Sequence, residues 1–151
     1  MKKYKIYFLL FTIFSKTLIS QNLADKKVLV VWGGWDGHKP ELFANHVENW
    51  LIKEKADYKI INGLDAYDNY DELIKYDLII QSVTMDEISK KQEENLLKAV
   101  LSGVGIAGAH GGLVDSFRKN TNYQFMIGGQ WVAHPGNIIK YKVKMLEDEL
   151  T

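Results

Sequence analysis

Short apolar runs and amphipathic stretches alternate along the chain. The first run, Val28–Trp32 (VLVVW), shows no alternation of apolar and polar residues, as expected of a strand buried on both faces of a sheet. Leu78–Val83 (LIIQSV) has the same character. Together with three weaker patterns, these runs predict strands at Val28–Trp32, Tyr58–Ile61, Leu78–Val83, Val104–Ala107 and Ile138–Met145.

Between the strands, the spacing of apolar residues predicts two longer helices. The first begins near Pro40, because proline is favoured in the first helical turn. The second follows Ser89, which forms a capping box with Gln92, and it ends at Gly103. We expect the first helix to bury Phe43, Val47, Trp50 and Leu51, with His46 packed beside them, and the second to bury Leu96, Leu97, Val100 and Leu101. Shorter helical segments are predicted at Asp71–Tyr76 and from about Leu113.

This alternation of strands and helices is typical of βαβ units, which form a parallel sheet through right-handed crossovers. The sequence therefore predicts a flavodoxin-like α/β fold, with helices on both faces of a parallel sheet. Ligands of such sheets bind at the carboxyl ends of the strands. Polar loops follow three of the predicted strands, at Gly33–Lys39, Thr84–Glu87 and Ala109–Gly112, and we expect them to converge on one site.

The segment GAHGG, residues 108–112, matches the G-x-S-x-G spacing of a nucleophile elbow, with His110 at its apex. Glycines flank such an apex because its strained backbone packs against the next helix and leaves no room for a Cβ atom. The partial positive charge at the start of that helix disfavours an imidazolium, and a neutral imidazole accepts a proton or binds a metal ion. His110 is therefore a candidate acid or base, and serine-esterase or amidotransferase chemistry is disfavoured. The alternative is that His110 only holds the loops in place by hydrogen bonds.

The loop WGGWDGHKP brings Trp35, Asp36 and His38 directly after the first predicted strand. Trp35 can stack on a sugar ring, and Asp36 can bind hydroxyl groups or act as a base. The loop matches neither G-x-G-x-x-G nor the P-loop pattern, so it does not indicate a nucleotide site. The alternative is a tight turn with its tryptophans in the core, which is the interpretation we favour for Trp32.

A long stretch broken by glycines, QFMIGGQWVAHPG, contains Gln130, Trp131 and His134. Ordered loops of this length are more often functional than not, so Gln130 and His134 are candidates for binding substrate. The alternative is a surface loop anchored in the core by Phe125, Met126 and Trp131.

Asp115 and Arg118, just past the elbow, can reach the same cleft, or they can form a solvated pair on a helix face. His38, His110 and His134 together suggest a three-histidine metal site. None of the three is paired at the i, i+4 spacing of zinc-protease motifs, so we assign no metal or cofactor and keep a divalent metal as a minority hypothesis.

Residues 1–20 have the features of a signal peptide. Lys2, Lys3 and Lys5 precede the apolar run Ile6–Phe14, which is too short to span a bilayer. We expect cleavage after Ser20 or Gln21, no stable membrane anchor, and a periplasmic or secreted location. An N-terminal anchor helix is the alternative.

The remaining chain has few features that suggest a macromolecular partner. Without residues 1–20 it holds 15 basic and 19 acidic residues, a net charge of −4, and no basic face. Nucleic acid and anionic membrane are therefore poor candidates as partners. The 151 residues contain no cysteine, so stability depends on the core of a single globular domain and not on disulfides.

The segments VLVVWGGWDGHKPE, TMDEIS, GIAGAHGGLVDSFR and NTNYQFMIGGQWVAHPGNI together resemble the trehalose-utilisation (ThuA-like) family. The resemblance covers residues 27–151 and implies a class I glutamine amidotransferase-like fold, in which His110 stands where amidotransferases carry their cysteine. It also implies a part in the use of disaccharides such as trehalose and sucrose, through oxidised 3-keto sugars. By resemblance, the residues that line the cleft are His38, His110, Arg118, Gln130 and His134.

Members of this family continue past the position of Thr151, so the resemblance implies a domain that is incomplete at its C-terminus, with an uncovered edge strand. We expect an exported protein that processes an oxidised disaccharide or glycoside, a small-molecule carbohydrate. His110 and Asp36 are the expected catalytic groups, Trp35 a stacking platform, and Arg118 and Gln130 ligands of hydroxyl groups. Two alternatives are a non-catalytic carbohydrate-binding or accessory module and a metal-dependent hydrolase that uses the three histidines.

Overall fold

The computed structural model describes residues 23–142 and 144. At its centre is a sheet of parallel strands in the order β2-β1-β3-β4, which matches the flavodoxin-like order. The strands are β1 (Lys27–Gly34), β2 (Asp57–Asn62), β3 (Leu78–Thr84) and β4 (Gly105–Gly108). The α/β prediction and the first four predicted strands are therefore confirmed. The predicted signal peptide, residues 1–20, lies outside the described residues.

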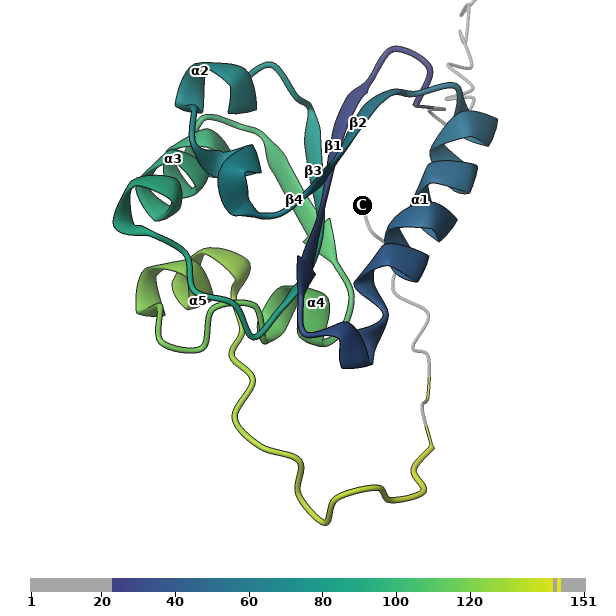
Figure 1. The fold of residues 1–151 in the computed structure, drawn as a ribbon, viewed down its shortest axis with the longest axis vertical. Coiled ribbons are helices and arrows are strands. Elements are labelled where there is room, and N and C mark those ends of the chain that lie inside the picture. The colour runs from purple at the N-terminus through teal and green to yellow at the C-terminus, as the bar shows by residue number, and fades with distance from the viewer. Residues whose placement is uncertain (1–22, 143, 145–151) are drawn as a thin grey trace, which may run out of the picture.

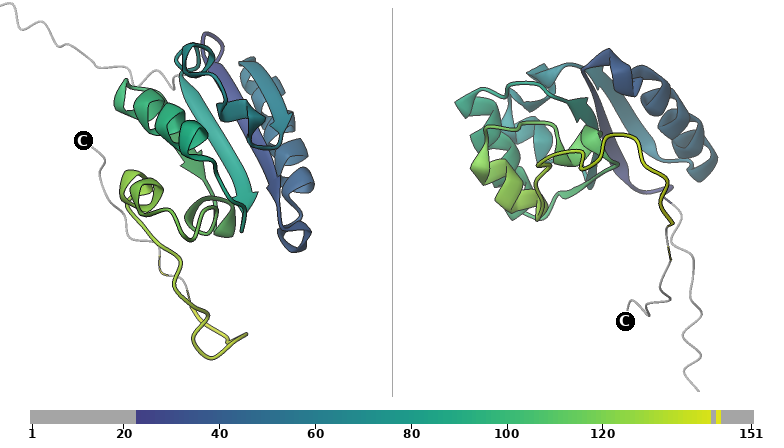
Figure 2. Two further views of the ribbon diagram at one scale, coloured as in Figure 1. Left: turned by 60° about the vertical axis from the view of Figure 1, so that its left-hand side comes forward. Right: turned by 90° about the horizontal axis from the view of Figure 1, so that it is seen from below.

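Helices flank the sheet on both sides (Figures 1 and 2). One side is covered by α1 (Pro40–Glu54), which follows the short 3-10 helix η1 (Asp36–His38). The opposite side carries η2 (Leu64–Tyr67), α2 (Tyr70–Leu73), α3 (Lys90–Leu101) and α5 (Thr121–Ile127), while the single turn α4 (Gly111–Val114) lies near the carboxyl ends of the strands. In the described part of the chain, no helix is both long enough and apolar enough to cross a membrane.

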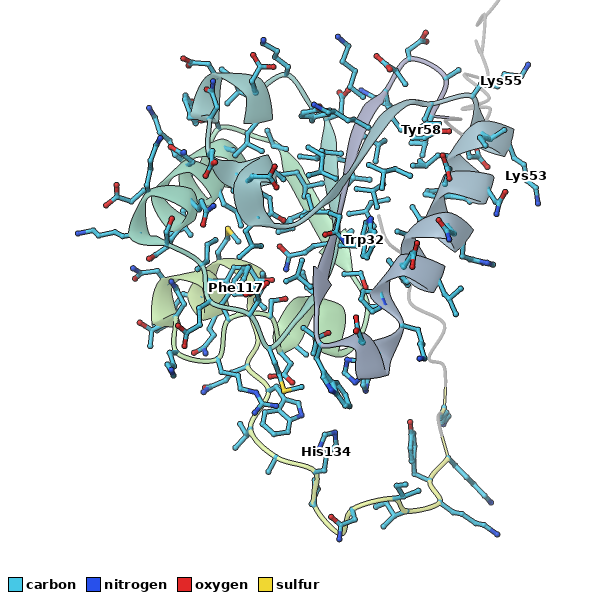
Figure 3. The ribbon with its side chains drawn as sticks, in the orientation of Figure 1. Trp32, Lys53, Lys55, Tyr58, Phe117 and His134 are labelled. Atoms are coloured by element: carbon cyan, nitrogen blue, oxygen red, sulfur yellow. The ribbon has the colours of Figure 1, made fainter. Side chains whose placement is uncertain are left out.

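The continuous apolar run of β1 is explained by these two layers, because successive side chains of a strand point to opposite faces. Val28 and Val30 pack with the α1 side chains Ala44, Val47 and Leu51. Leu29 and Val31 pack in the other layer with Leu96 and Ala99 of α3. Burying each such aliphatic side chain stabilises the fold by about 1.5–3 kcal/mol. Trp32 is half-buried against the α1 layer, as predicted, and Figure 3 shows it on that side of the sheet.

The predicted capping box of α3 is present, since Ser89 accepts a hydrogen bond from the backbone N–H of Gln92 and Gln92 reaches back to Ser89. The helix buries Leu96 as expected, but the expectation for Leu101 was wrong, because 87% of this side chain is exposed. At about 100° per residue, Leu101 lies roughly 140° around the helix from Leu96 and so points away from the sheet.

The buried face of α1 is also displaced from the predicted one. It is centred on Ala44, Val47 and Leu51, whereas Trp50 is 42% exposed and His46 is exposed. Trp50 lies about 90° from the centre of this face, and His46 farther still. His46 therefore does not pack against the core, contrary to the expectation.

The predicted strand Ile138–Met145 is not formed by the residues that the structure describes there. Residues 138–142 and 144 have no regular secondary structure, and Ile138 and Tyr141 are exposed. An alternating pattern favours a strand only where a neighbouring strand can supply backbone hydrogen bonds, and this segment has no such neighbour among the described strands. In the alternative interpretation of the segment QFMIGGQWVAHPG, Phe125 was a core anchor, but it belongs to α5 and is 86% exposed.

Candidate functional site

Residues from three separate loops meet at the carboxyl ends of β1, β3 and β4. The backbone N–H of Trp35, after β1, donates a 2.8 Å hydrogen bond to the carbonyl of Thr84 at the end of β3. His38 Nδ1 lies 3.0 Å from Thr84 Oγ1, and the His38 ring contacts that of His110 with the ring centroids 4.9 Å apart. The predicted convergence of the loops is therefore confirmed.

His110 stands at the apex of a sharp turn between β4 and α4. Its backbone has φ 53° and ψ −139°, a conformation that costs a non-glycine residue about 1–3 kcal/mol. The backbone N–H groups of Leu113 and Val114 donate to the carbonyl of His110, which stabilises the turn. The His110 side chain is exposed. The backbone therefore presents this imidazole to solvent, as the elbow spacing predicts.

The glycines at both ends of the elbow are required by close packing. A Cβ atom on Gly108 would lie 2.5 Å from the carbonyl oxygen of Gln81, and one on Gly112 would lie 2.9 Å from Cα of Ser82. Both contacts are with the backbone of β3, which cannot move aside cheaply. The glycine spacing thus seats the elbow directly against β3.

The helix that follows the elbow has only four residues, Gly111–Val114. A single turn carries few aligned peptide dipoles, so its N-terminus contributes less to the environment of His110 than the sequence suggested. The neighbouring His38 ring also lies against the elbow. It occupies the space beside Gly111, where an added Cβ would lie 2.5 Å from His38 Cε1.

Trp35 extends the histidine pair toward solvent. Its ring meets the His38 ring edge-on with the centroids 4.9 Å apart, and 51% of the side chain is exposed. An exposed indole next to two imidazoles provides an apolar surface with polar groups at its border. Asp36, the next residue, begins η1 and is exposed. Both residues are thus placed beside the histidine pair and are not packed in the core.

A buried polar network supports the elbow from below. Gln81 of β3 accepts a 2.6 Å hydrogen bond from the Tyr67 hydroxyl and donates from Nε2 to Ser116 Oγ (2.8 Å) and the Tyr123 hydroxyl (2.6 Å). Tyr123 in turn donates to the carbonyl of Leu113 in α4. The network therefore ties β3 to α4 and α5, and it fixes the backbone that presents His110.

Burial shifts the pKa values of the two tyrosines of this network upward. It raises the pKa of Tyr123 to about 12, although the hydrogen bonds with Ser116 and Gln81 act in the opposite direction. Burial also raises the pKa of Tyr67 well above its usual value, and repulsion from an ionised Tyr123 adds to this effect. At neutral pH both hydroxyls remain hydrogen-bond donors.

Arg118 is held in a fixed position by two neighbours. Its Nε and Nη2 donate to the two carboxylate oxygens of Asp115, at 2.5 and 2.9 Å, and Asp115 is 3% exposed. The guanidinium stacks on the ring of Trp131, with Cζ 4.1 Å from the centroid. The hydrogen bonds to Asp115 raise the pKa of Arg118. The predicted pair is thus partly buried, and it anchors the segment that follows α5.

The remaining predicted binding residues lie on that segment. Gln130 and His134 are both exposed, and the His134 ring contacts Trp131 with the centroids 5.1 Å apart. Figure 3 shows His134 on the extended segment, outside the body of the domain. The structure therefore joins His38 to His110 but groups His134 with Trp131. In the described residues, no three His, Asp or Glu side chains are placed to hold a metal ion.

A hollow of about 390 Å³ begins at Met85, the residue after Thr84. It is formed by the loop after β3 and by the connection between α4 and α5. Its lining residues are Met85, Asp86, Glu87, Ile88, Phe117, Arg118, Lys119 and Asn120. Among the residues that the sequence singled out for binding, this hollow contains Arg118 and none of the histidines.

Sequence reasoning missed several residues that build the site. Gln81 had a visible signal, since a glutamine in the run LIIQSV must satisfy its amide inside the fold. Glu87 lies at the end of the predicted loop Thr84–Glu87 but was not singled out, and Lys119 had no signal. Only the tertiary structure brings their side chains to 2.7 Å from each other.

Comparisons with known proteins agree with this architecture. The family model ThuA, described as trehalose utilisation, matches residues 27–151. A solved structure of a protein described as ThuA-like, from Bacteroides uniformis ATCC 8492, is similar in fold with a TM-score of 0.56 and 18% sequence identity. The similarity covers 72% of this chain and 44% of that one, so this chain spans less than half of that protein's length. No protein with a curated description matches the chain significantly.

The family match includes all three loops of the site and the elbow with histidine at its apex. The parallel sheet agrees with the fold of the structural neighbour. This chain therefore belongs to the ThuA, or trehalose utilisation, family.

Proposed function

We propose that this protein is an exported enzyme that processes an oxidised disaccharide or glycoside of the trehalose or sucrose type, with His110 as its general acid and base. Family membership supports a role in the use of such sugars. Export rests on the basic and apolar pattern of residues 1–20. The observation that carries the catalytic assignment is the exposed His110 imidazole, presented on a strained turn and in contact with His38.

The proposed chemistry uses the acidity that a ketone gives to its neighbouring carbon. In a 3-keto glycoside, His110 takes the proton from C2, and the electron pair of that C–H bond forms a C1–C2 double bond. The bond from C1 to the glycosidic oxygen breaks, and the protonated imidazole returns the proton to that oxygen. An enone and an alcohol result, and His110 regains its starting state. Addition of water to the enone completes a hydrolysis.

The other side chains of the site bind and orient the sugar in this proposal. Trp35 offers an exposed ring on which a pyranose can stack. Asp36 lies beside it as an acceptor for hydroxyl groups and as a second candidate base. His38 is held at Thr84 and fixes the ring of His110. Arg118, Gln130 and His134 are proposed to contact more distant hydroxyl groups.

The experiment is turnover of 3-keto-trehalose by the purified protein, followed by release of glucose. His110→Ala is expected to lower kcat about 10²–10⁴-fold, the usual contribution of general acid–base catalysis, with KM within about twofold. His46→Ala is the matched control, because His46 is exposed on α1, away from the loops of the site, and its loss leaves turnover unchanged.

Three outcomes would contradict the proposal. Unchanged turnover in His110→Ala would remove the role of this histidine. Binding of the sugar by the wild-type protein without turnover at any pH would favour a carbohydrate-binding or accessory module. Loss of activity on chelation, with recovery on adding Zn²⁺, would favour a metal-dependent hydrolase.

A further inference from the structure

The hollow beside Arg118 has the size and border of a small-molecule site. Its volume of about 390 Å³ lies within the range of pockets that hold small ligands, about 300–1,000 Å³. Met85, Ile88 and Phe117 supply apolar surface, and Phe117 belongs to the core of the domain. The hollow therefore has an apolar floor that reaches the core at Phe117, while its border is polar.

The charges around the hollow balance each other. Two carboxylates, Asp86 and Glu87, lie on one loop, and two cations, Arg118 and Lys119, lie on the facing connection. Lys119 Nζ is 2.7 Å from Glu87 Oε1, so this pair bridges the two loops, and Arg118 is already bound by Asp115. A site with both signs of charge and no net excess suits a neutral ligand with many hydroxyl groups better than an ion. Carboxylates accept from such hydroxyls, and ammonium groups donate to them.

The hollow adjoins the histidine site through a single stretch of backbone. Thr84 contacts His38 with its side chain, and Met85, the next residue, lines the hollow. The backbone N–H of Met85 donates to the carbonyl of Asp115, which fixes this stretch against the connection that carries Arg118. The hollow and the histidine pair therefore lie next to each other at one edge of the sheet, so two linked rings can reach both.

We infer that this hollow is the binding subsite for the second ring of a two-ring sugar, and that Glu87 and Lys119 determine the preference for disaccharides over monosaccharides. The inference rests on the proposed function, in which the reacting ring lies at Trp35 and His110. Glu87 and Lys119 bind the far ring and leave the near ring untouched.

The experiment is calorimetric titration of the full chain with trehalose, sucrose and glucose. Glu87→Ala and Lys119→Ala are expected to weaken the binding of a disaccharide by roughly fivefold to tenfold, while glucose binding changes by less than about twofold. Both side chains are at least 80% exposed, so the variants are expected to fold.

Two kinds of control separate the possible causes. Glu72→Ala and Lys75→Ala remove another exposed ion pair, one that lies with Lys27 near the amino end of β1 and so far from the site. These variants are expected to bind all three sugars like the wild type. Trp35→Ala removes the proposed platform of the near ring and is expected to weaken glucose and the disaccharides alike.

The possible results are distinguishable. Weaker binding of disaccharides alone in Glu87→Ala and Lys119→Ala would support the subsite. The subsite would be overturned if the wild type bound glucose and disaccharides with equal affinity, or if both variants bound disaccharides as the wild type does. The proposed function would still stand in either case if Trp35→Ala weakened sugar binding. Absence of binding for all three sugars, and for 3-keto-trehalose titrated in the same way, would overturn the proposed function and the subsite with it.

Discussion

Replacement of Gln81 by leucine tests the buried network under the elbow. The two side chains are similar in size, but leucine has no polar atom. Gln81 is fully buried, and its amide makes the hydrogen bonds with Tyr67, Ser116 and Tyr123 that connect β3 to the elbow layer. Gln81→Leu therefore removes the centre of the network without creating a large cavity.

The expected cost follows from the groups that remain. The Tyr67 hydroxyl is buried, and it has no other hydrogen-bond partner among the described residues, so it is left unsatisfied at a cost of about 1–3 kcal/mol. Tyr123 and Ser116 each lose one donor but keep their own bonds to the carbonyls of α4. We expect Gln81→Leu to lower the free energy of unfolding by about 3 kcal/mol in total.

A double-mutant cycle with Tyr67→Phe isolates the contact. Once the hydroxyl is gone, leucine at position 81 leaves no orphaned donor, so the double variant is expected to be less destabilised than the sum of the single variants by about 1–2 kcal/mol. Urea unfolding of the four proteins, followed by circular dichroism, measures this coupling. Tyr70→Phe with Ser102→Ala is the matched control, because that hydroxyl pair is 3.0 Å apart but exposed.

The reasoning would be refuted by either of two results. One is a cost below about 0.5 kcal/mol for Gln81→Leu, which is the size of an ordinary surface change. The other is a coupling energy no larger than that of the exposed control pair. In both cases the buried amide would not be what joins β3 to the elbow layer.

Two further predictions concern the site and the pH dependence of stability. Gly111→Ala places a Cβ 2.5 Å from His38 Cε1, so it is expected to displace His38, to lower turnover by about tenfold or more and to lower the free energy of unfolding by only about 1 kcal/mol. Gly129→Ala is the control, because its added Cβ would lie 3.8 Å from the nearest atom. Equal activity of the two variants would contradict the role of His38. Burial raises the pKa of Tyr67 and raises that of Tyr123 to about 12, so these tyrosines ionise in the unfolded chain first, near pH 10. The free energy of unfolding is therefore expected to be constant below pH 10 and to fall between pH 10 and 12 by about 1 kcal/mol per pH unit for each tyrosine. Urea unfolding at a series of pH values measures this slope, which is expected to be smaller in Tyr123→Phe.

The sequence predicted the framework of the fold because its signals are local. The run Val28–Trp32 indicates a doubly buried strand by itself, and the capping box at Ser89 fixes the start of α3 through residues only three positions apart. The same signals predicted the positions of the helices more accurately than they predicted which face of each helix is buried. Trp50 and Leu101 follow the expected spacing but lie at the margins of their helices' buried faces, and which margin is covered depends on where the helix docks.

Within the candidate site, the elbow likewise has one feature that local sequence predicts and one that depends on the tertiary structure. Its glycine spacing is a local pattern, so the sequence alone determined the turn and its exposed apex at His110. The pairing of His110 with His38, 72 residues away, required β1 and β4 to end at the same edge of one sheet with β3 between them. Of the strand predicted at Ile138–Met145, the described residues 138–142 and 144 form none, since its pattern needs a neighbouring strand that local sequence does not provide.

The sequence by itself therefore determined the α/β class, the family, the four strands of the described sheet and the three loops of the candidate site. Only the tertiary structure decided that Thr84 would hold His38, that Gln81 would support the elbow, and that a hollow would lie beside the Glu87–Lys119 ion pair. The physical reason is the distance along the chain over which each kind of interaction acts. Periodicity and capping act over a few residues along the chain, whereas side-chain contacts at a site depend on strand order and register, which bring distant segments within a few ångströms.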